Sequence, residues 1–156
     1  MKKFSLLLLC LCISACAGHT WEDPSNSRMI SNNYFDASIE PSPNYPKGFN
    51  SLLLKVKNKT DKDLTIDWSR SFYLRDGATN GGLDNRNRCY TGKKDPDIIF
   101  PGGSFETYVY PDVLLVEEWR GCDHDYLPVG VNGVMLSVIC EGKEIREKMN
   151  VRIRPK

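Results

Sequence analysis

Several features that would point to a specific activity are scarce or missing in this chain of 156 residues. It has only two histidines, which leaves little choice for a histidine-dependent catalytic site. Lys and Arg number 21 against 20 Asp and Glu, so there is no basic excess of the kind that nucleic-acid-binding domains carry. No apolar run reaches the roughly 20 residues that a membrane-spanning helix needs. The composition therefore argues against nucleic-acid binding and a membrane-spanning helix, and it restricts a histidine-dependent site to two residues.

The first part of the chain has the layout of a secretory signal peptide. Lys2 and Lys3 precede an apolar run over residues 4–13, and small residues follow that run. We expect residues 1–15 to be removed on export. Two of the 21 basic residues and no acid leave with this segment, so the remaining chain carries 19 basic against 20 acidic residues and is nearly neutral.

The end of this segment, Ile13-Ser14-Ala15-Cys16, resembles the lipobox of bacterial lipoproteins. In that family the cysteine thiol receives a diacylglycerol, the signal is cut before it, and the new N-terminus is acylated with a fatty acid such as palmitate. The resemblance implies that Cys16 anchors the protein, since two or more acyl chains hold stably in a bilayer. Ala17 stands where enteric members kept in the inner membrane have Asp, which implies the outer membrane. The periplasmic side is the expected orientation, and the outer surface is the alternative.

Three cysteines remain for the domain after the signal peptide and Cys16 are set aside. Export places them under oxidising conditions, where one bridge can form and one thiol is left over. Cys89 and Cys122 lie in polar stretches that contain glycine, whereas Cys140 ends an apolar run. We predict a Cys89–Cys122 disulfide with Cys140 as a small buried hydrophobe. A Cys89–Cys140 bridge is the alternative.

The rest of the chain divides into a polar segment and a series of short periodic segments. Residues 16–33 show no period and predict a flexible tether. From residue 34 apolar and polar residues alternate, which is typical of half-buried strands. The segments 52–56 and 64–68, joined by a polar turn, predict a hairpin, and three prolines are expected to end the first strand in a long loop. The expected strands cover residues 35–39, 52–56, 64–68, 71–75, 98–100, 105–109, 134–140 and 145–153.

About eight short strands without an amphipathic helix predict an all-β, antiparallel sandwich or barrel. Trp68, expected on an inner strand, resembles the core tryptophan of immunoglobulin-like domains, although no domain cysteine precedes it. Residues 54–68, 76–82 and 130–134 are similar to a pattern in small exported bacterial lipoproteins with one immunoglobulin-like domain. The resemblance implies an immunoglobulin-like β-sandwich of about 7–8 strands over residues 34–156, and it transfers no catalytic residue.

Two polar groups are candidates for metal binding or catalysis. Cys122-Asp123-His124-Asp125 contains metal-ligand types, and a small hydrolase would have to use His124 with a neighbouring carboxylate, because His19 lies in the tether. No Gly-x-Ser-x-Gly motif stands near His124. We expect no metal or cofactor. Calcium in loop 76–96 stays open, because turn chemistry explains equally well the hard oxygens of Asp76, Asn80, Asp84 and Asn85.

We expect the protein to act by binding, through loops rather than strand faces. Loop 76–96 carries Arg86 and Arg88, and loop 120–128 carries Asp123. A Cys89–Cys122 bridge would join the two loops into one polar surface, with these three side chains as the predicted contacts. The expected partners are the membrane, through the lipid, and another envelope protein or complex. The alternative site is the exposed face of the last strand at Arg152 and Arg154.

Overall fold

The structure is a computed structural model that describes residues 18–23, 26–44, 48–85, 94–118 and 121–155. For residues 44, 117–118 and 121–124 it describes the backbone only. Apart from two single-turn 3₁₀ helices, η1 (Trp68–Arg70) and η2 (Asp112–Leu114), the regular structure in this part is entirely β. The all-β class predicted from the alternating segments is confirmed.

The described residues form thirteen strands, more than the sequence predicts, because several expected loops contain short paired segments. In chain order the strands are β1 (His19–Glu22), β2 (Met29–Ser31), β3 (Phe35–Asn44), β4 (Gly48–Asn58), β5 (Leu64–Ile66), β6 (Phe72–Arg75), β7 (Ala78–Asp84), β8 (Asp97–Ile99), β9 (Ser104–Pro111), β10 (Leu115–Glu118), β11 (Gly121–His124), β12 (Gly130–Cys140) and β13 (Lys143–Pro155).

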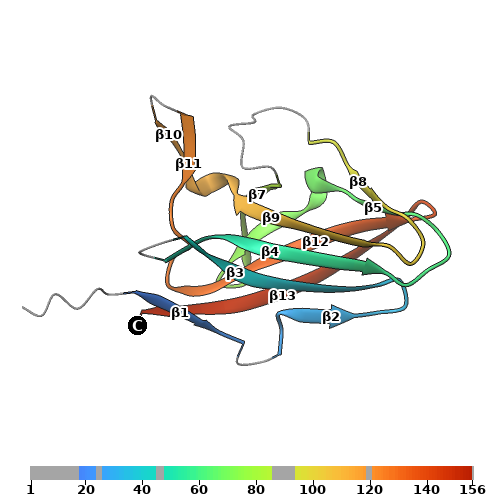
Figure 1. The fold of residues 1–156 in the computed structure, drawn as a ribbon, viewed down its shortest axis with the longest axis horizontal. Helices are drawn as coiled ribbons and strands as arrows, with labels where there is room; N and C mark the ends of the chain where they lie inside the picture. Colours follow the sequence, from blue (N-terminus) through green and yellow to red (C-terminus); the bar gives the residue numbers. More distant parts are fainter. Residues whose placement is uncertain (1–17, 24–25, 45–47, 86–93, 119–120, 156) are drawn as a thin grey trace, which may run out of the picture.

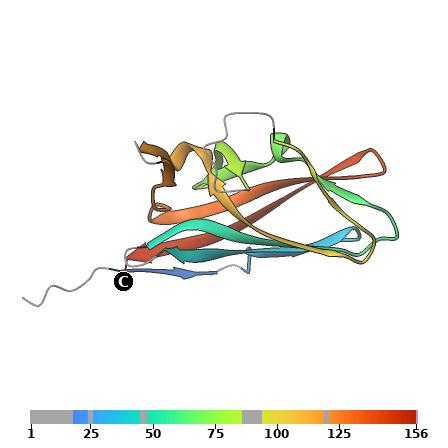
Figure 2. The same ribbon diagram turned by 45° about the horizontal axis from the view of Figure 1, so that its top comes forward.

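Eleven of these strands form one antiparallel sheet that curls over a single core. Its order is β1-β13-β12-β6-β7-β9-β4-β3-β2, with β5 beside β12 and β8 beside β5. The link between β7 and β9 consists of only two residue pairs, Leu83 with Pro111 and Asp84 with Tyr110. The curl brings β12 and β13 over β3 and β4 (Figures 1 and 2). The hairpin of β10 and β11 stands apart as a separate two-stranded sheet.

The core lies on the concave side of this sheet and follows the alternation of the sequence. Every second residue of β3, β4, β12 and the end of β13 points inward. Burying a side chain of this size contributes about 1.5–3 kcal/mol each, so the alternation is the main driving force for the curled arrangement. The core residues with no exposed surface are Phe35, Ile39, Leu52, Leu54, Leu64, Ile66, Tyr73, Leu83, Val109, Val134, Leu136, Val138 and Met149.

The hairpin predicted for residues 52–56 and 64–68 is wrong. β4 pairs with β3 and β9, whereas β5 pairs with β12 and β8. The turn between them crosses from one layer to the other because it is organised by Asn58, which is fully buried. Its amide nitrogen donates to the carbonyls of Lys62 at 2.6 Å and Ile99 at 3.0 Å. The Asn58 amide thus joins the turn after β4 to the end of β8, and β4 and β5 do not pair with each other.

The flexible tether predicted up to residue 33 is wrong for two segments, β1 and β2. β1 pairs with the end of β13, and β2 pairs with β3. Trp21 of β1 packs against the core, and the Arg28 guanidinium lies 5.7 Å from the centre of its ring. The sequence did not predict these strands, because short edge strands are held mainly by backbone hydrogen bonds and need no alternation of apolar residues.

The prolines near residue 42 do not end β3 as predicted. β3 continues through Pro41 and Pro43 to Asn44, with a shift in register after Ser42. β2 covers β3 only from Asp36 to Ser38, so both prolines lie where β3 has an unpaired edge in the described part of the chain. Proline is tolerated there because no ladder bond requires its missing N–H group.

Candidate functional site

The two ends of the long loop between β7 and β8 are joined by hydrogen bonds to one carboxylate, that of Asp97. Asp97 Oδ2 accepts a hydrogen bond from Trp68 Nε1 and another from Asn85 Nδ2, each at 2.8 Å. Asn85 follows β7 and Asp97 opens β8, so the two ends of residues 86–96 are fixed to the same oxygen. We call Trp68, Asn85 and Asp97 the loop base. A long loop with fixed ends is an arrangement that functional loops often use.

Trp68 connects the loop base to the core. The side chain is 1% exposed, and its ring centroid lies 6.4 Å from that of Phe105. It lies on η1 and not on a strand as predicted. The short helix turns the backbone so that the indole N–H leaves the core toward Asp97. A buried indole normally needs such an acceptor.

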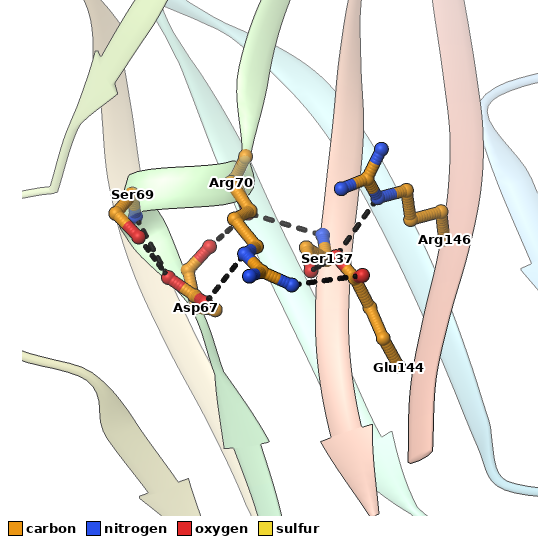
Figure 3. Close-up of polar contacts among 7 residues, drawn as sticks. Asp67, Ser69, Arg70, Ser137, Glu144 and Arg146 are labelled. Carbon is orange, nitrogen blue, oxygen red and sulfur yellow. Dashed lines mark hydrogen bonds and ion pairs between the residues drawn. The ribbon is translucent and has the colours of Figure 1, made fainter. Parts of the chain in front are cut away.

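A second polar cluster holds η1 in place from the other side (Figure 3). The serine–glutamate cluster consists of Asp67, Ser69, Arg70, Ser71, Ser137, Glu144 and Arg146. Asp67 caps η1, since its carboxylate accepts from the Ser69 backbone at 3.0 Å. The Ser71 hydroxyl donates to the Asp67 carbonyl at 2.8 Å and accepts from the Ser137 backbone N–H at 3.0 Å. These bonds tie η1 to β12.

Glu144 completes the serine–glutamate cluster from β13. Its carboxylate accepts from the Ser137 hydroxyl and from Arg146 Nε, both at 2.8 Å, and from Arg70 Nη1 at 3.1 Å. The hydrogen bond from Ser137 is the main reason, and that from Arg146 the second, that the pKa of Glu144 lies below its usual value. Every described member of the cluster has a partner within it, so its role is to position η1 and Trp68.

A separate polar contact joins β7 to η2, which lies outside the two loops of the predicted joint surface. Asp112 Oδ1 accepts from the Gly82 backbone N–H at 2.8 Å, and Asp112 Oδ2 lies 3.9 Å from Lys94 Nζ. Lys94 also donates to the Leu83 carbonyl. η2 leads directly into β10, so Asp112 holds the root of the β10–β11 hairpin next to β7. We call Gly81, Gly82, Lys94 and Asp112 the η2 junction.

Two consecutive glycines make the η2 junction possible. A Cβ atom at Gly81 would lie 2.4 Å from Val113 Cγ1, and one at Gly82 would lie 2.6 Å from Asp112 Oδ2. Gly81 also has a φ of +94°, a conformation that side chains disfavour. The sequence predicts an irregular loop at these glycines, whereas they lie within strand β7. Their adjacency was the one sequence feature that could have indicated a close approach of another segment.

The predicted contact residues fall at the limits of the described chain. Arg86, Arg88 and Cys89 lie outside it, and Asp123 is described by its backbone alone, paired with Val116 in the β10–β11 hairpin. The Cys89–Cys122 bridge therefore stays a prediction. Cys140 is buried and free, in agreement with the role predicted for the third thiol. His124 and Cys122 lie in β11, where the sequence predicted loop.

The segment after β11 is held by a third polar group around Asn132. Asn132, fully buried, accepts from the Tyr73 hydroxyl and donates to the Pro128 carbonyl at 2.8 Å. Arg75 donates to the carbonyls of Pro128 at 3.0 Å and Val129 at 2.6 Å. Burial raises the pKa of Tyr73 further above its ordinary value, to about 12. The return of the chain from the hairpin to β12 is thereby fixed.

The calcium alternative gains no support from the described residues. Asp76 pairs with Arg75 at 3.1 Å in the β6–β7 turn, and Asp84 is buried at the far end of β7. Within residues 18–155, leaving out the undescribed segments, no group of three or more His, Cys, Asp or Glu is arranged to hold a metal ion.

No helix in the described part of the chain is long and apolar enough to cross a membrane. Comparison of the chain with family models, curated proteins and solved structures found no match.

Loss of the Asp97 carboxylate should release both ends of the loop. We expect Asp97→Ala to lower the free energy of unfolding by about 1–3 kcal/mol, because the buried indole N–H loses its acceptor. Urea unfolding measures this change, and limited proteolysis should show faster cleavage within residues 86–96. The matched control is Asp95→Ala, since Asp95 is exposed two residues away. Equal behaviour of the two variants would contradict the role of the loop base.

The depressed pKa of Glu144 predicts a pH dependence of stability. A carboxyl group with a folded-state pKa below its ordinary value of 4.5 stabilises the fold above that pH, and the contribution is lost as the pH falls through the folded-state pKa. We therefore expect Glu144→Gln to lower the urea midpoint at pH 7 and to approach the parent protein in strong acid. Glu106→Gln, at an exposed ion pair with Lys55, is the control. A difference that stays constant with pH would contradict the assignment.

Proposed function

We propose that this protein is an exported bacterial lipoprotein, anchored by acyl chains on Cys16, that binds another envelope protein or complex and has no catalytic role. The observation that carries the proposal is the sequence Ile13-Ser14-Ala15-Cys16 behind a short signal-like apolar run. Ala17 favours the outer membrane, with the domain on its periplasmic side.

The binding site in this proposal is the polar surface shared by loop 86–96 and the β10–β11 hairpin, with Arg86, Arg88 and Asp123 as contacts. The loop base supports it, because Asp97 fixes the two ends of the loop. The η2 junction supports it too, because Asp112 holds the root of the hairpin next to β7. A Cys89–Cys122 bridge would add a covalent link between the same two segments.

The finer fold assignment in this proposal is an immunoglobulin-like sandwich in which the extra strands are short additions to a core of seven or eight. The buried Trp68 and the facing layers support it. The continuous curl through β7 and β9 is the feature that departs from a sandwich of two separate sheets.

Replacement of Cys16 tests the anchor. We expect Cys16→Ser to abolish acylation, because serine lacks the thiol that takes the diacylglycerol, and the protein should be released from membranes or remain unprocessed. Intact mass spectrometry of the membrane fraction measures both outcomes. Cys12→Ser, within the same signal segment, is the matched control and should be acylated normally. A Cys16→Ser protein that is processed and keeps wild-type membrane behaviour would exclude the lipoprotein assignment.

Charge reversal tests the binding surface. We expect Arg86→Glu with Arg88→Glu to reduce capture of the envelope partner at least tenfold in cross-linking experiments in cells, read by mass spectrometry. The thermal midpoint should stay unchanged, because exposed charges contribute little to folding. Lys55→Glu with Lys57→Glu makes the same charge change on the exposed faces of β4 and serves as the control. If the variant at Arg86 and Arg88 still captures the partner and the variant at Lys55 and Lys57 does not, the binding site would lie on β4.

A further inference from the structure

The chain end that leads to Cys16 is fixed beside the end of the last strand. His19 of β1 pairs with Pro155 of β13, and Thr20 pairs with Arg154. Figures 1 and 2 both show the beginning of β1 and the end of β13 at the same corner of the molecule. Because β1 is part of the sheet, the domain does not begin at residue 34 and the connection to Cys16 is short.

The length of this connection limits how far the domain can stand from a lipid on Cys16. Two residues, Ala17 and Gly18, separate Cys16 from His19. Three consecutive Cα steps span at most about 11 Å. A domain attached at that distance keeps the corner formed by β1 and the end of β13 close to the bilayer surface.

The surface at this corner is basic. Alternation along β13 buries Val151 and Ile153 and turns Arg152 and Arg154 outward, with 46% and 58% of their side chains exposed. Glu22 of β1 is the only described acid in ion-pair contact with these arginines, at 3.8 Å from Arg152 Nε and in direct contact with Arg154 Nη2. One carboxylate between two guanidinium groups leaves a net positive charge.

The same basic row continues along β13 away from the corner. Lys148 lies on the outward side, and in the described structure its Nζ atom reaches only the Gly77 carbonyl, at 3.5 Å. Arg146 follows on the same side but is paired with Glu144. The uncompensated charge in the described structure therefore lies along β13 from Lys148 to Arg154 and ends where Arg146 pairs with Glu144.

We infer that this corner, formed by Thr20, Glu22, Arg152 and Arg154 with Lys148 next to it along β13, is the membrane-facing surface of the protein, where the two arginines bind phosphate groups of anionic phospholipids. A guanidinium group offers paired donors that match phosphate oxygens. Basic residues at a surface held near a bilayer are attracted to anionic lipid headgroups. The short link to Cys16 favours a bilayer over an acidic protein as the occupant.

The inference rests on the proposed acylation of Cys16, so the experiment first verifies the acyl chains by intact mass. The purified full-length lipoprotein is then placed in phosphatidylcholine vesicles with or without phosphatidylglycerol, each lipid carrying a photoactivatable group on its headgroup. We expect cross-links to concentrate in residues 19–22 and 148–155 and to be several-fold stronger with phosphatidylglycerol. A protein without acyl chains would refute the proposed function, whereas an acylated protein tests this inference alone.

The variant Arg152→Gln with Arg154→Gln should lose most of the phosphatidylglycerol cross-links, whereas Lys55→Gln with Lys57→Gln should keep them. Urea unfolding verifies that both variants fold. Equal cross-linking to the two lipids would overturn the inference, and so would undiminished cross-linking in the arginine variant. Cross-links centred on residues 100–103, in the turn between β8 and β9, would overturn it as well. Cross-linking in cells that joins Arg152 or Arg154 to a protein instead of lipid would overturn it in favour of an acidic protein partner.

Discussion

A single carboxylate oxygen, Asp97 Oδ2, links the main parts of this structure. It satisfies the buried indole of Trp68, which fills the core beside Phe105, and it holds Asn85 at the far side of the longest loop. The short helix η1, from which Trp68 projects, depends in turn on the serine–glutamate cluster, which ties its backbone to β12 and β13. Core packing and loop placement are therefore coupled, and a change at either one reaches the other through η1.

The sequence predicts the class of this fold because one physical rule, alternation of apolar residues along strands, governs most of the core. Val134, Leu136 and Val138 are buried as their spacing predicts. The pairing of strands does not follow from that rule. β4 and β5 alternate cleanly and are joined by a polar turn, yet two acceptors of the Asn58 amide, the carbonyls of Ile99 and Phe100, lie more than forty residues away at the end of β8. Contacts of that range leave no local pattern, and β1 escaped prediction because edge pairing uses the backbone.

In the candidate site, too, the sequence predicts the local features but not the contacts between distant segments. The polar loops were identified by composition, but the groups that position them join residues far apart in the chain. Asp112 contacts Gly82, and the Ser137 backbone N–H contacts the Ser71 hydroxyl. Only the pair Gly81-Gly82 could have indicated the η2 junction from the sequence, since a close approach requires the absence of side chains. Arg86 and Arg88 stay predictions, because their placement lies outside the described residues.

The antiparallel pairing of β1 with β13 has a practical consequence for labelling. A reporter protein joined after residue 156 would emerge next to His19, and a bulky fusion there would crowd the chain end that leads toward Cys16. The turn between β12 and β13, at Glu141 and Gly142, lies at the other end of both long strands and is exposed. An epitope inserted in that turn would leave the paired chain ends in their native arrangement.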